Sequence, residues 1–323
     1  PPGIRGGFPI DFQIDPRDPN RIFANNYGGG NFLSEDGGKS WQVASTGYTG
    51  AQIRDLFIDP NYPGVVYAAA RSGIFLSRDG GKTWSGLGAD PYNVLEWNAI
   101  VADPTNPSLF LAGTNWWSLL LYSSDGGRSW EKVLELEPNR GVRSLIHSPS
   151  NPDWVYAGTG GYFSAGGFDP NISGQGIYLS RDRGGNWDQI TTGEYSDAHV
   201  LDISIHPEDP ESLYAATSNH GIIRTWNAGE SWQEITEGIR MRHGANAVAV
   251  DPINPDVILA GIAFGGIYRS EDGGESWGQS AAGLTPEANI TDIIIDPTNP
   301  DIVYASDSFS GVYRSSDGGI TWH

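Results

Sequence analysis

Short runs of β-branched and aromatic residues, separated by turns rich in proline, glycine and aspartate, recur along the whole chain. One copy shows the order. Thr291–Asp296 ends at a D-P-x-N-P turn, Ile302–Ala305 follows it, and Val312–Ser315 leads into an S-x-D-G-G-x-[ST]-W hairpin. A further run, such as Gln42–Ser45, follows the tryptophan of the hairpin. Runs of this kind, bounded by turn residues and without sustained helical periodicity, predict four β-strands in each copy.

Seven copies of this unit follow one another along the chain. Each copy contains one hairpin motif, as in Ser34–Trp41 (SEDGGKSW), and one turn motif, as in Ile14–Ala24 (IDPRDPNRIFA). The motif tryptophans lie 43, 46, 57, 45, 45 and 45 residues apart, and the long interval comes from an insertion at Gly160–Gly176. Four strands per unit at this period is the pattern of a propeller blade. We therefore predict an all-β fold, a seven-bladed β-propeller with four-stranded antiparallel blades.

The units account for residues 1–323, which we interpret as a single propeller with one hairpin motif in each blade. The chain stops at His323, one residue after the seventh motif tryptophan and before the outer strand of the last blade. That strand is expected beyond residue 323 or from the N-terminus. The prolines and glycines of residues 1–7 make a poor strand, which favours a longer native chain.

The hairpin motif has a physical rationale. Its aspartate can accept hydrogen bonds from backbone amides of its own turn, and its two glycines can adopt positive φ. Its tryptophan offers a large apolar face to the blade, with its N–H expected near the surface. Each turn contributes one carboxylate, too few oxygen ligands for calcium. We therefore interpret the motifs as scaffold and expect no bound metal.

Four aspartates share one register, four residues before the D-P turn: Asp11, Asp55, Asp202 and Asp292. The first strand of each unit is expected to surround the propeller axis. Two interpretations are open for these carboxylates. They form an incomplete acidic ring that holds a cation or shifts a pKa, or each of them hydrogen-bonds the neighbouring blade. We favour the second interpretation.

Composition narrows the function classes. Nineteen basic against 39 acidic residues give a net charge of −20, which disfavours nucleic acid and anionic lipid surfaces. The absence of cysteine excludes disulfides, zinc–thiolate sites and cysteine nucleophiles. No stretch approaches the ~20 apolar residues of a membrane span, and no catalytic triad, P-loop or dinucleotide motif is present. We expect no cofactor, no nucleic-acid partner, no membrane insertion, and an extracellular, periplasmic or cell-surface location.

The hairpins, together with the D-P-x-N-P elements, resemble those of the BNR/Asp-box propellers over essentially the whole chain. This family includes sortilin-like proteins, sialidases, xyloglucanase-type glycoside hydrolases and photosystem II assembly factors. The resemblance implies the propeller fold, with the boxes as scaffold. Xyloglucanase-type enzymes have a catalytic aspartate in a motif whose counterpart here is Phe23–Phe32 (FANNYGGGNF), which places Tyr27 at that position. This departure argues against hydrolase activity.

We expect function on the face formed by the loops between second and third strands and between blades, because those loops differ from unit to unit. The loops are rich in aromatic residues, with arginines, histidines and carboxylates among them. Flat rings and planar hydrogen-bonding groups suit sugar rings and equally suit protein partners. The candidate ligand-binding residues are Tyr27, Arg71, Trp97, Trp116, Trp117, Tyr162, Phe163, Phe168, Tyr195, His220, Arg242, Phe264 and Phe309.

Three functions follow as hypotheses. The first is a secreted or cell-surface binding or assembly module that holds a glycan or a protein partner on this face. The second is a glycoside hydrolase, xyloglucanase-like or sialidase-like, which needs two carboxyl groups ~5–9.5 Å apart; its catalytic candidates are Asp197, Asp307 and Glu194. The third is a structural subunit of a larger surface assembly.

Overall fold

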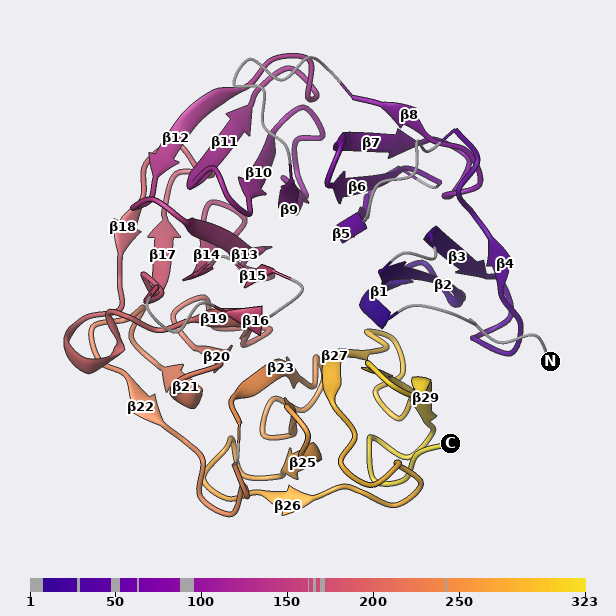
Figure 1. The fold of residues 1–323 in the computed structure, drawn as a ribbon, viewed down its shortest axis with the longest axis vertical. Coiled ribbons are helices and arrows are strands. Elements are labelled where there is room, and N and C mark those ends of the chain that lie inside the picture. The colour runs from indigo at the N-terminus through magenta and orange to yellow at the C-terminus, as the bar shows by residue number, and fades with distance from the viewer. Residues whose placement is uncertain are drawn as a thin grey trace.

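The computed structural model describes residues 8–27, 30–47, 53–62, 64–87, 96–161, 163–164, 167–168, 172–241 and 243–323. These residues form seven antiparallel β-sheets arranged as blades around a central axis (Figure 1). The first strand of each blade lies nearest the axis, and the chain then builds outward (Figure 1). The fold is the predicted seven-bladed β-propeller.

The strands follow the repeat from blade to blade. Blades 1 to 3 consist of β1 (Phe8–Asp15), β2 (Asp18–Tyr27), β3 (Gly30–Ser34), β4 (Gln42–Val43), β5 (Ile53–Ile58), β6 (Val66–Ala70), β7 (Gly73–Ser77), β8 (Ser85–Gly86), β9 (Trp97–Ala102), β10 (Phe110–Thr114), β11 (Leu119–Ser123) and β12 (Glu131–Glu135). Blade 4 consists of β13 (Arg140–His147), β14 (Val155–Gly161), β17 (Ile177–Ser180) and β18 (Asp188–Gln189), and its long loop contains a separate hairpin, β15 (Phe163–Ser164) and β16 (Gly167–Phe168).

A short 3-10 helix, η1 (Gly193–Tyr195), lies between blades 4 and 5. Blades 5 to 7 consist of β19 (Val200–Ile205), β20 (Leu213–Thr217), β21 (Gly221–Thr225), β22 (Gln233–Glu234), β23 (Ala245–Val250), β24 (Ile258–Ile262), β25 (Gly266–Ser270), β26 (Gly278–Gln279), β27 (Ile290–Ile295), β28 (Val303–Asp307) and β29 (Gly311–Ser315). Most outer strands are only two residues long, as in β4, where the sequence predicted four residues.

In the part of the chain that the structure describes, six blades have four strands and blade 7 has three. The backbone of His323 nevertheless pairs with that of Arg314, with N···O distances of 3.0 and 3.1 Å. Arg269 and Gly278 pair in the same way at the start of the outer strand of blade 6. His323 therefore occupies the position at which the outer strand begins in blade 6.

A one-residue β-bulge interrupts the pairing of the innermost strand at the same place in blades 2 to 7. The side chains around the bulge reach the inner strand of the next blade. Asp55 Oδ2 accepts the backbone N–H of Ile100 (2.7 Å), and Asp202 Oδ2 accepts that of Val248 (2.9 Å). The predicted hydrogen bond to the neighbouring blade is therefore confirmed for these two aspartates.

The other two aspartates of this register lie in blades 7 and 1. Asp292 follows the bulge of β27, and the side chain of Asp11 lies outside the described residues. Among the residues that the structure places, no group of three or more histidine, aspartate or glutamate side chains is suited to hold a metal ion.

The apolar core is divided among the interfaces between neighbouring blades. Ile177 and Leu179 of blade 4, for example, pack with Val200 and Ile203 of blade 5, and all four are buried. Each Å² of apolar surface removed from water in this way contributes about 25 cal/mol. The ring is therefore stabilised by contacts that no single blade makes by itself.

The hairpin motifs fold as the sequence predicts. Asp36 accepts the backbone N–H of Ser40 at Oδ1 (2.9 Å) and its hydroxyl at Oδ2 (2.6 Å). These hydrogen bonds lower the pKa of Asp36 to about 2. Gly37 and Gly38 have φ of 70° and 83°, the left-handed region that glycine enters without strain.

The tryptophan N–H groups differ from the prediction, because several of them are buried between blades instead of lying near the surface. The indole N–H of Trp84 donates to the carbonyl of Ala44 (2.8 Å), and that of Trp277 donates to the carbonyl of Ile235 (2.8 Å). Both tryptophans are buried, and both acceptors belong to the preceding blade. A buried donor requires a partner, so the box tryptophan also joins its blade to the previous one.

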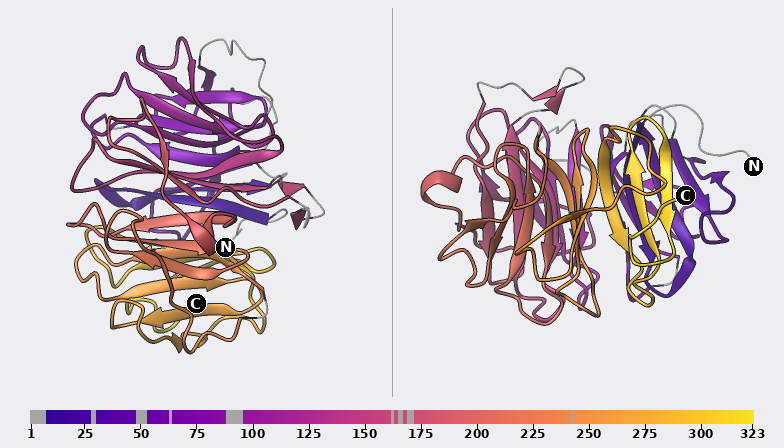
Figure 2. Two further views of the ribbon diagram at one scale, coloured as in Figure 1. Left: turned by 90° about the vertical axis from the view of Figure 1, so that its left-hand side faces the viewer. Right: turned by 90° about the horizontal axis from the view of Figure 1, so that it is seen from below.

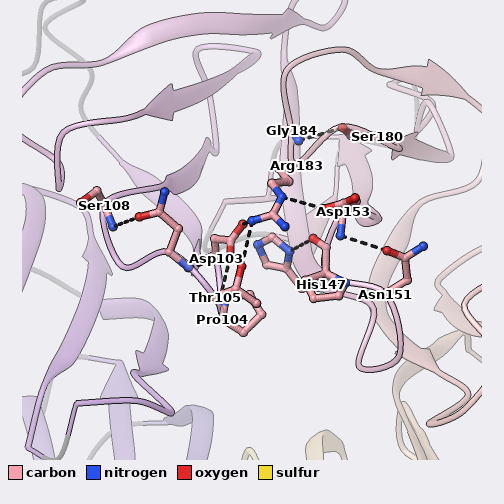
Figure 3. Close-up of polar contacts among 12 residues, drawn as sticks. Asp103, Pro104, Thr105, Ser108, His147, Asn151, Asp153, Ser180, Arg183 and Gly184 are labelled. Atoms are coloured by element: carbon pink, nitrogen blue, oxygen red, sulfur yellow. Dashed lines mark hydrogen bonds and ion pairs between the residues drawn. The ribbon is translucent and has the colours of Figure 1, made fainter.

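A polar network joins blades 3 and 4 (Figure 3). Arg183 stands where the usual box has its first glycine and keeps a positive φ of 63°. Its guanidinium binds Asp103 Oδ2 of blade 3 (3.0 Å) and Asp153 Oδ1 of its own blade (2.6 Å). Beside it, His147 Nδ1 donates to the carbonyl of Pro152 (3.0 Å), and burial lowers the pKa of His147. These contacts give the network a structural role.

Candidate binding face

The turns and boxes lie on one face of the disc, and the loops between second and third strands and between blades form the other, here called the variable face. The β15–β16 hairpin, in which Phe163 and Phe168 are backbone partners, stands out from this face (Figure 2). Tyr27 ends β2 at the same face. The side chains of these three residues lie outside the described part, as do the whole residues Tyr162 and Arg242.

Two indole rings project from the loop between β10 and β11. Trp116 and Trp117 are 48% and 42% exposed. The hydroxyl of Thr114, at the start of the loop, accepts the N–H of Leu119 (3.0 Å) and donates to its carbonyl (3.1 Å). The carbonyl of Ser118 accepts an N–H from the connection to blade 4 (2.7 Å). The rings are therefore carried by a loop whose two ends are fixed to each other.

Glu96 holds the same loop from the side. Its carbonyl accepts the N–H of Asn115 (2.9 Å), its carboxylate accepts the side-chain amide of Asn115 (3.0 Å), and it pairs with Arg71 (2.9 Å). Asn115 is fully buried, and its Oδ1 has no hydrogen-bond partner among the described residues. Glu96 and Ser118 have φ of 79° and 60°, a left-handed conformation that costs a non-glycine residue about 1–3 kcal/mol. Such strain persists only where surrounding contacts hold it.

A second group lies between blades 4 and 5. The ring of Tyr195, at the end of η1, meets the ring of His220 edge-on at 5.2 Å. His220 Nε2 lies 3.0 Å from Asp197 Oδ1. Three of the predicted residues are thus brought together, while Glu194 is an exposed residue of η1.

A third group spans blades 6 and 7. Phe264 and Phe309 occupy equivalent loop positions in the two blades, and their ring centroids are 6.0 Å apart. His243 meets Phe264 edge-on at 5.4 Å. Phe264 and Phe309 are 45% and 66% exposed, and Phe264 has a positive φ of 55°. We call Phe264 and Phe309 the phenyl row.

Two candidates have surroundings that the sequence did not predict. Trp97 is the first residue of β9 and is only 2% exposed, packed 5.6 Å from Trp130 in the core, where the sequence placed it in an exposed interblade loop. Asp307 is also fully buried and accepts the N–H groups of Asn289 (3.0 Å) and Phe309 (3.2 Å). Its carboxylate therefore shapes the loop that presents Phe309.

A cavity of about 320 Å³ lies elsewhere, at the outer edge between blade 5 and the box of blade 6. Its lining includes Glu234, Glu237 and Glu275, and none of the predicted ligand-binding residues. Within the described ranges, no helix has the length and apolar character needed to span a bilayer. The variable face therefore offers exposed rings on fixed loops, whereas this cavity is lined mainly by polar groups.

Comparison with solved structures identifies other propellers of the same fold. The GH74 xyloglucanase from Xanthomonas campestris superimposes with a TM-score of 0.78 at 18% identity, over 98% of this chain and 53% of its own. The structure of YCF48 bound to a D1 peptide superimposes with a TM-score of 0.70 at 17% identity, over 97% of this chain and 94% of its own. The extracellular domain of a putative one-component system from B. thetaiotaomicron superimposes with a TM-score of 0.70 at 15% identity, over 97% of this chain and 39% of its own. The chain thus spans about half the length of the xyloglucanase.

Sequence comparison agrees with the structural one. A search among curated proteins finds no match. The BNR/Asp-box repeat model matches residues 313–323. The Sortilin-Vps10 model, described as sortilin, neurotensin receptor 3, matches residues 30–139 and 118–240, together more than half of the chain. The chain belongs to the Sortilin-Vps10 family.

Proposed function

We propose that the propeller is a secreted or cell-surface binding module that recognises a glycan through Trp116 and Trp117. The observation that carries this proposal is the exposure of both indoles on a loop held at each end by hydrogen bonds. A loop that is already fixed loses little freedom on binding, which raises affinity. Indole faces are suited to the apolar faces of sugar rings.

The polar groups beside the rings narrow the glycan class. The Arg71–Glu96 pair supplies planar donors and acceptors within the same loop cluster, and these suit sugar hydroxyls. The net charge of −20 repels sulfated or uronic-acid polymers at long range. We therefore propose a neutral polysaccharide or oligosaccharide as the ligand.

The test is titration of soluble neutral glycans, first selected on an array, into wild type and the Trp116→Ala/Trp117→Ala variant. We expect the variant to lose affinity by about tenfold or more. Trp226→Ala is the matched control, because Trp226 is also 48% exposed but belongs to the box of blade 5, on the opposite face. Equal loss in both variants, or no loss in the first, would contradict the proposal.

A protein partner is the second candidate function, and the phenyl row favours it. Phenyl rings have no polar group to direct a sugar hydroxyl, and exposed aromatic clusters are typical of protein interfaces. One solved neighbour, YCF48, is bound to a D1 peptide in its structure. Phe264→Ser/Phe309→Ser is expected to abolish binding of a purified partner, whereas Ile253→Ser, at a 66% exposed position of the opposite face, leaves it unchanged. An equal loss of partner binding in the two variants would show that the phenyl row is not the binding site.

The contacts of the predicted catalytic carboxylates support binding over hydrolysis. Asp307 is enclosed by amide donors, and Asp197 faces His220. Glycoside hydrolysis requires two carboxyl groups that reach one bond from opposite sides. Release of sugar from a polysaccharide panel by wild type, abolished in Asp197→Asn, would overturn the binding-only proposal. A structural subunit would instead show the variable face covered by a neighbouring chain.

A further inference from the structure

One imidazole closes the base of the long loop of blade 4. Gly161, at the end of β14, donates its backbone N–H to His199 Nδ1 (3.1 Å). The same ring hydrogen-bonds the backbone of Ile172, at the other end of the loop. An imidazole that accepts at Nδ1 is neutral and carries its proton on Nε2, so Nε2–H is the donor to the Ile172 carbonyl. His199 therefore joins the two ends of the loop in a single tautomer.

The packing around this ring is tight. A Cβ added at Gly161 would lie 2.9 Å from His199 Cε1 and 2.9 Å from the Ile172 carbonyl oxygen. His199 is itself fixed, because its N–H donates to Asn219 Oδ1 (2.9 Å) and its carbonyl accepts the N–H of Ser218 (3.0 Å). The imidazole thus has a defined position from which it reaches both ends of the loop.

Further contacts hold the base, and they do not depend on the proton of His199. Arg143 donates to the carbonyl of Gly161. Gly174 and Gly176 donate to the carbonyls of Asp197 (3.1 Å) and Ala198 (3.0 Å). The loop therefore stays attached to the blade when the imidazole changes its charge.

We propose that His199 is a positioning residue whose protonation releases the backbone of Gly161, at the base of the long loop on the variable face. The neutral ring fixes Gly161. The imidazolium has an N–H at both nitrogens, so it cannot accept the N–H of Gly161, and that bond is lost. The inference rests on the proposed function only in treating the variable face as the binding face.

The charges around the ring set the direction of the switch. Burial lowers the pKa of His199, the guanidinium of Arg143 lowers it further, and Arg140 acts in the same direction. Asp197 opposes them. Because the folded-state pKa lies below the ordinary value of about 6.5, the bond to Gly161 is present at neutral pH. It is lost as the pH falls below 6.5 through the lowered pKa.

Hydrogen exchange of the Gly161 amide, measured by NMR at a series of pH values from 7.5 down to 4 without any ligand, tests the proposal. After correction for the intrinsic rate, we expect exchange in wild type to become faster as the pH falls below 6.5, by at least about tenfold once the ring is protonated. His199→Gln keeps an acceptor and a donor that do not titrate, so its protection is expected to be independent of pH. His220→Gln, on the same face, should behave like wild type.

Wild-type protection that does not change with pH would overturn the proposal, and so would a pH dependence that survives in His199→Gln. A ¹⁵N spectrum of the imidazole gives a second readout, because the Nε2–H tautomer has separate Nδ1 and Nε2 signals that merge toward one position on protonation. Neither measurement involves a glycan. A failure here is therefore distinguishable from a failure of Trp116→Ala/Trp117→Ala to lose binding.

Discussion

Asp55 and Asp202 share one register in the inner strands of blades 2 and 5, and each binds the backbone of the following blade. Burial raises the pKa of Asp202 to about 6. Burial, with a smaller contribution from the charge of Asp202, raises the pKa of Asp55 to about 7. A folded-state pKa above the unfolded value stabilises the fold at low pH, and that contribution is lost as the pH rises through the folded-state pKa.

The melting temperature of wild type, measured relative to that of Asp55→Asn, is therefore expected to fall between pH 6.5 and 8.5, by about 2 °C. His147 and His199 have lowered pKa values, so in this range their unfolded rings release protons while the folded rings stay neutral; this raises stability with pH in both chains and cancels in the difference. Asp188→Asn, at an exposed carboxylate, should keep the pH dependence of wild type. Differential scanning calorimetry across the range provides the measurement, and an unchanged slope in Asp55→Asn would refute the assignment.

The sequence predicted the register of these aspartates because the repeat places equivalent residues at equivalent positions. It did not predict the burial of Trp97, although the repeat places Trp97 at the position of Val200, Ala245 and Ile290, which are buried as well. The parts played by Asn115 and Ser118 were also missed. A buried amide and a positive φ depend on tertiary contacts, and neither has a sequence pattern.

At the scale of the element, the Asp box shows which property of its aspartate the hairpin needs. Blade 5 has Asn227 at this position, and its Oδ1 accepts the N–H of Ser231 (3.0 Å). In blade 6, Asp272 Oδ1 accepts the N–H of Ser276 (2.9 Å). An amide oxygen therefore replaces the carboxylate oxygen as acceptor, and the negative charge is not required for the turn.

We expect Asp272→Asn to lower the melting temperature at pH 7 less than Asp272→Ala, because only the alanine variant leaves the turn without its acceptor. The two variants differ by one functional group and can be compared in a single calorimetric series. The wild-type chain is also expected to lose the stabilising contribution of Asp272 in acid. Its hydrogen bonds with Ser276 lower its pKa to about 2, so its contribution is lost as the pH falls from about 4 toward 2. Equal destabilisation by asparagine and alanine would contradict this account.

At the scale of the whole molecule, closure of the ring depends on contacts between blades 7 and 1. The hydroxyl of Tyr304, in β28, donates to the carbonyl of Gly37 in the first box (3.0 Å). The equivalent hydroxyl of Tyr214 donates to Gly273 (3.3 Å), which also accepts a bond from Arg224 (2.6 Å). The two tyrosines thus occupy the same place in the repeat, but among the described residues only the Gly273 carbonyl has a second donor.

Tyr304→Phe is expected to cost about 1 kcal/mol, or about 1–2 °C in melting temperature for a chain of this size. Tyr214→Phe should cost less, because Arg224 still satisfies the Gly273 carbonyl. Thermal unfolding of the two variants side by side measures the difference. Equal losses of stability would show that the hydroxyl of Tyr304 contributes no more to its contact between blades than the hydroxyl of Tyr214 does.

The whole-molecule architecture was predictable from sequence because seven box motifs and seven turn motifs alternate at a nearly constant period. The candidate site was predictable only in part. Variable loops indicated the right face and the exposed rings of Trp116, Trp117, Phe264 and Phe309. Which rings share a cluster depends on how loops from different blades meet, and one sequence does not contain that information.

Several of the hydrogen bonds between blades share a property with a consequence for how such a chain can change. Asp202 and Asn98 bind a backbone N–H and a backbone carbonyl of the next inner strand, and Tyr304 ends on a backbone carbonyl as well. A backbone group is the same whatever side chain it carries. These hydrogen bonds can therefore form again when a blade is duplicated or exchanged, without a matching substitution at the backbone group that they reach.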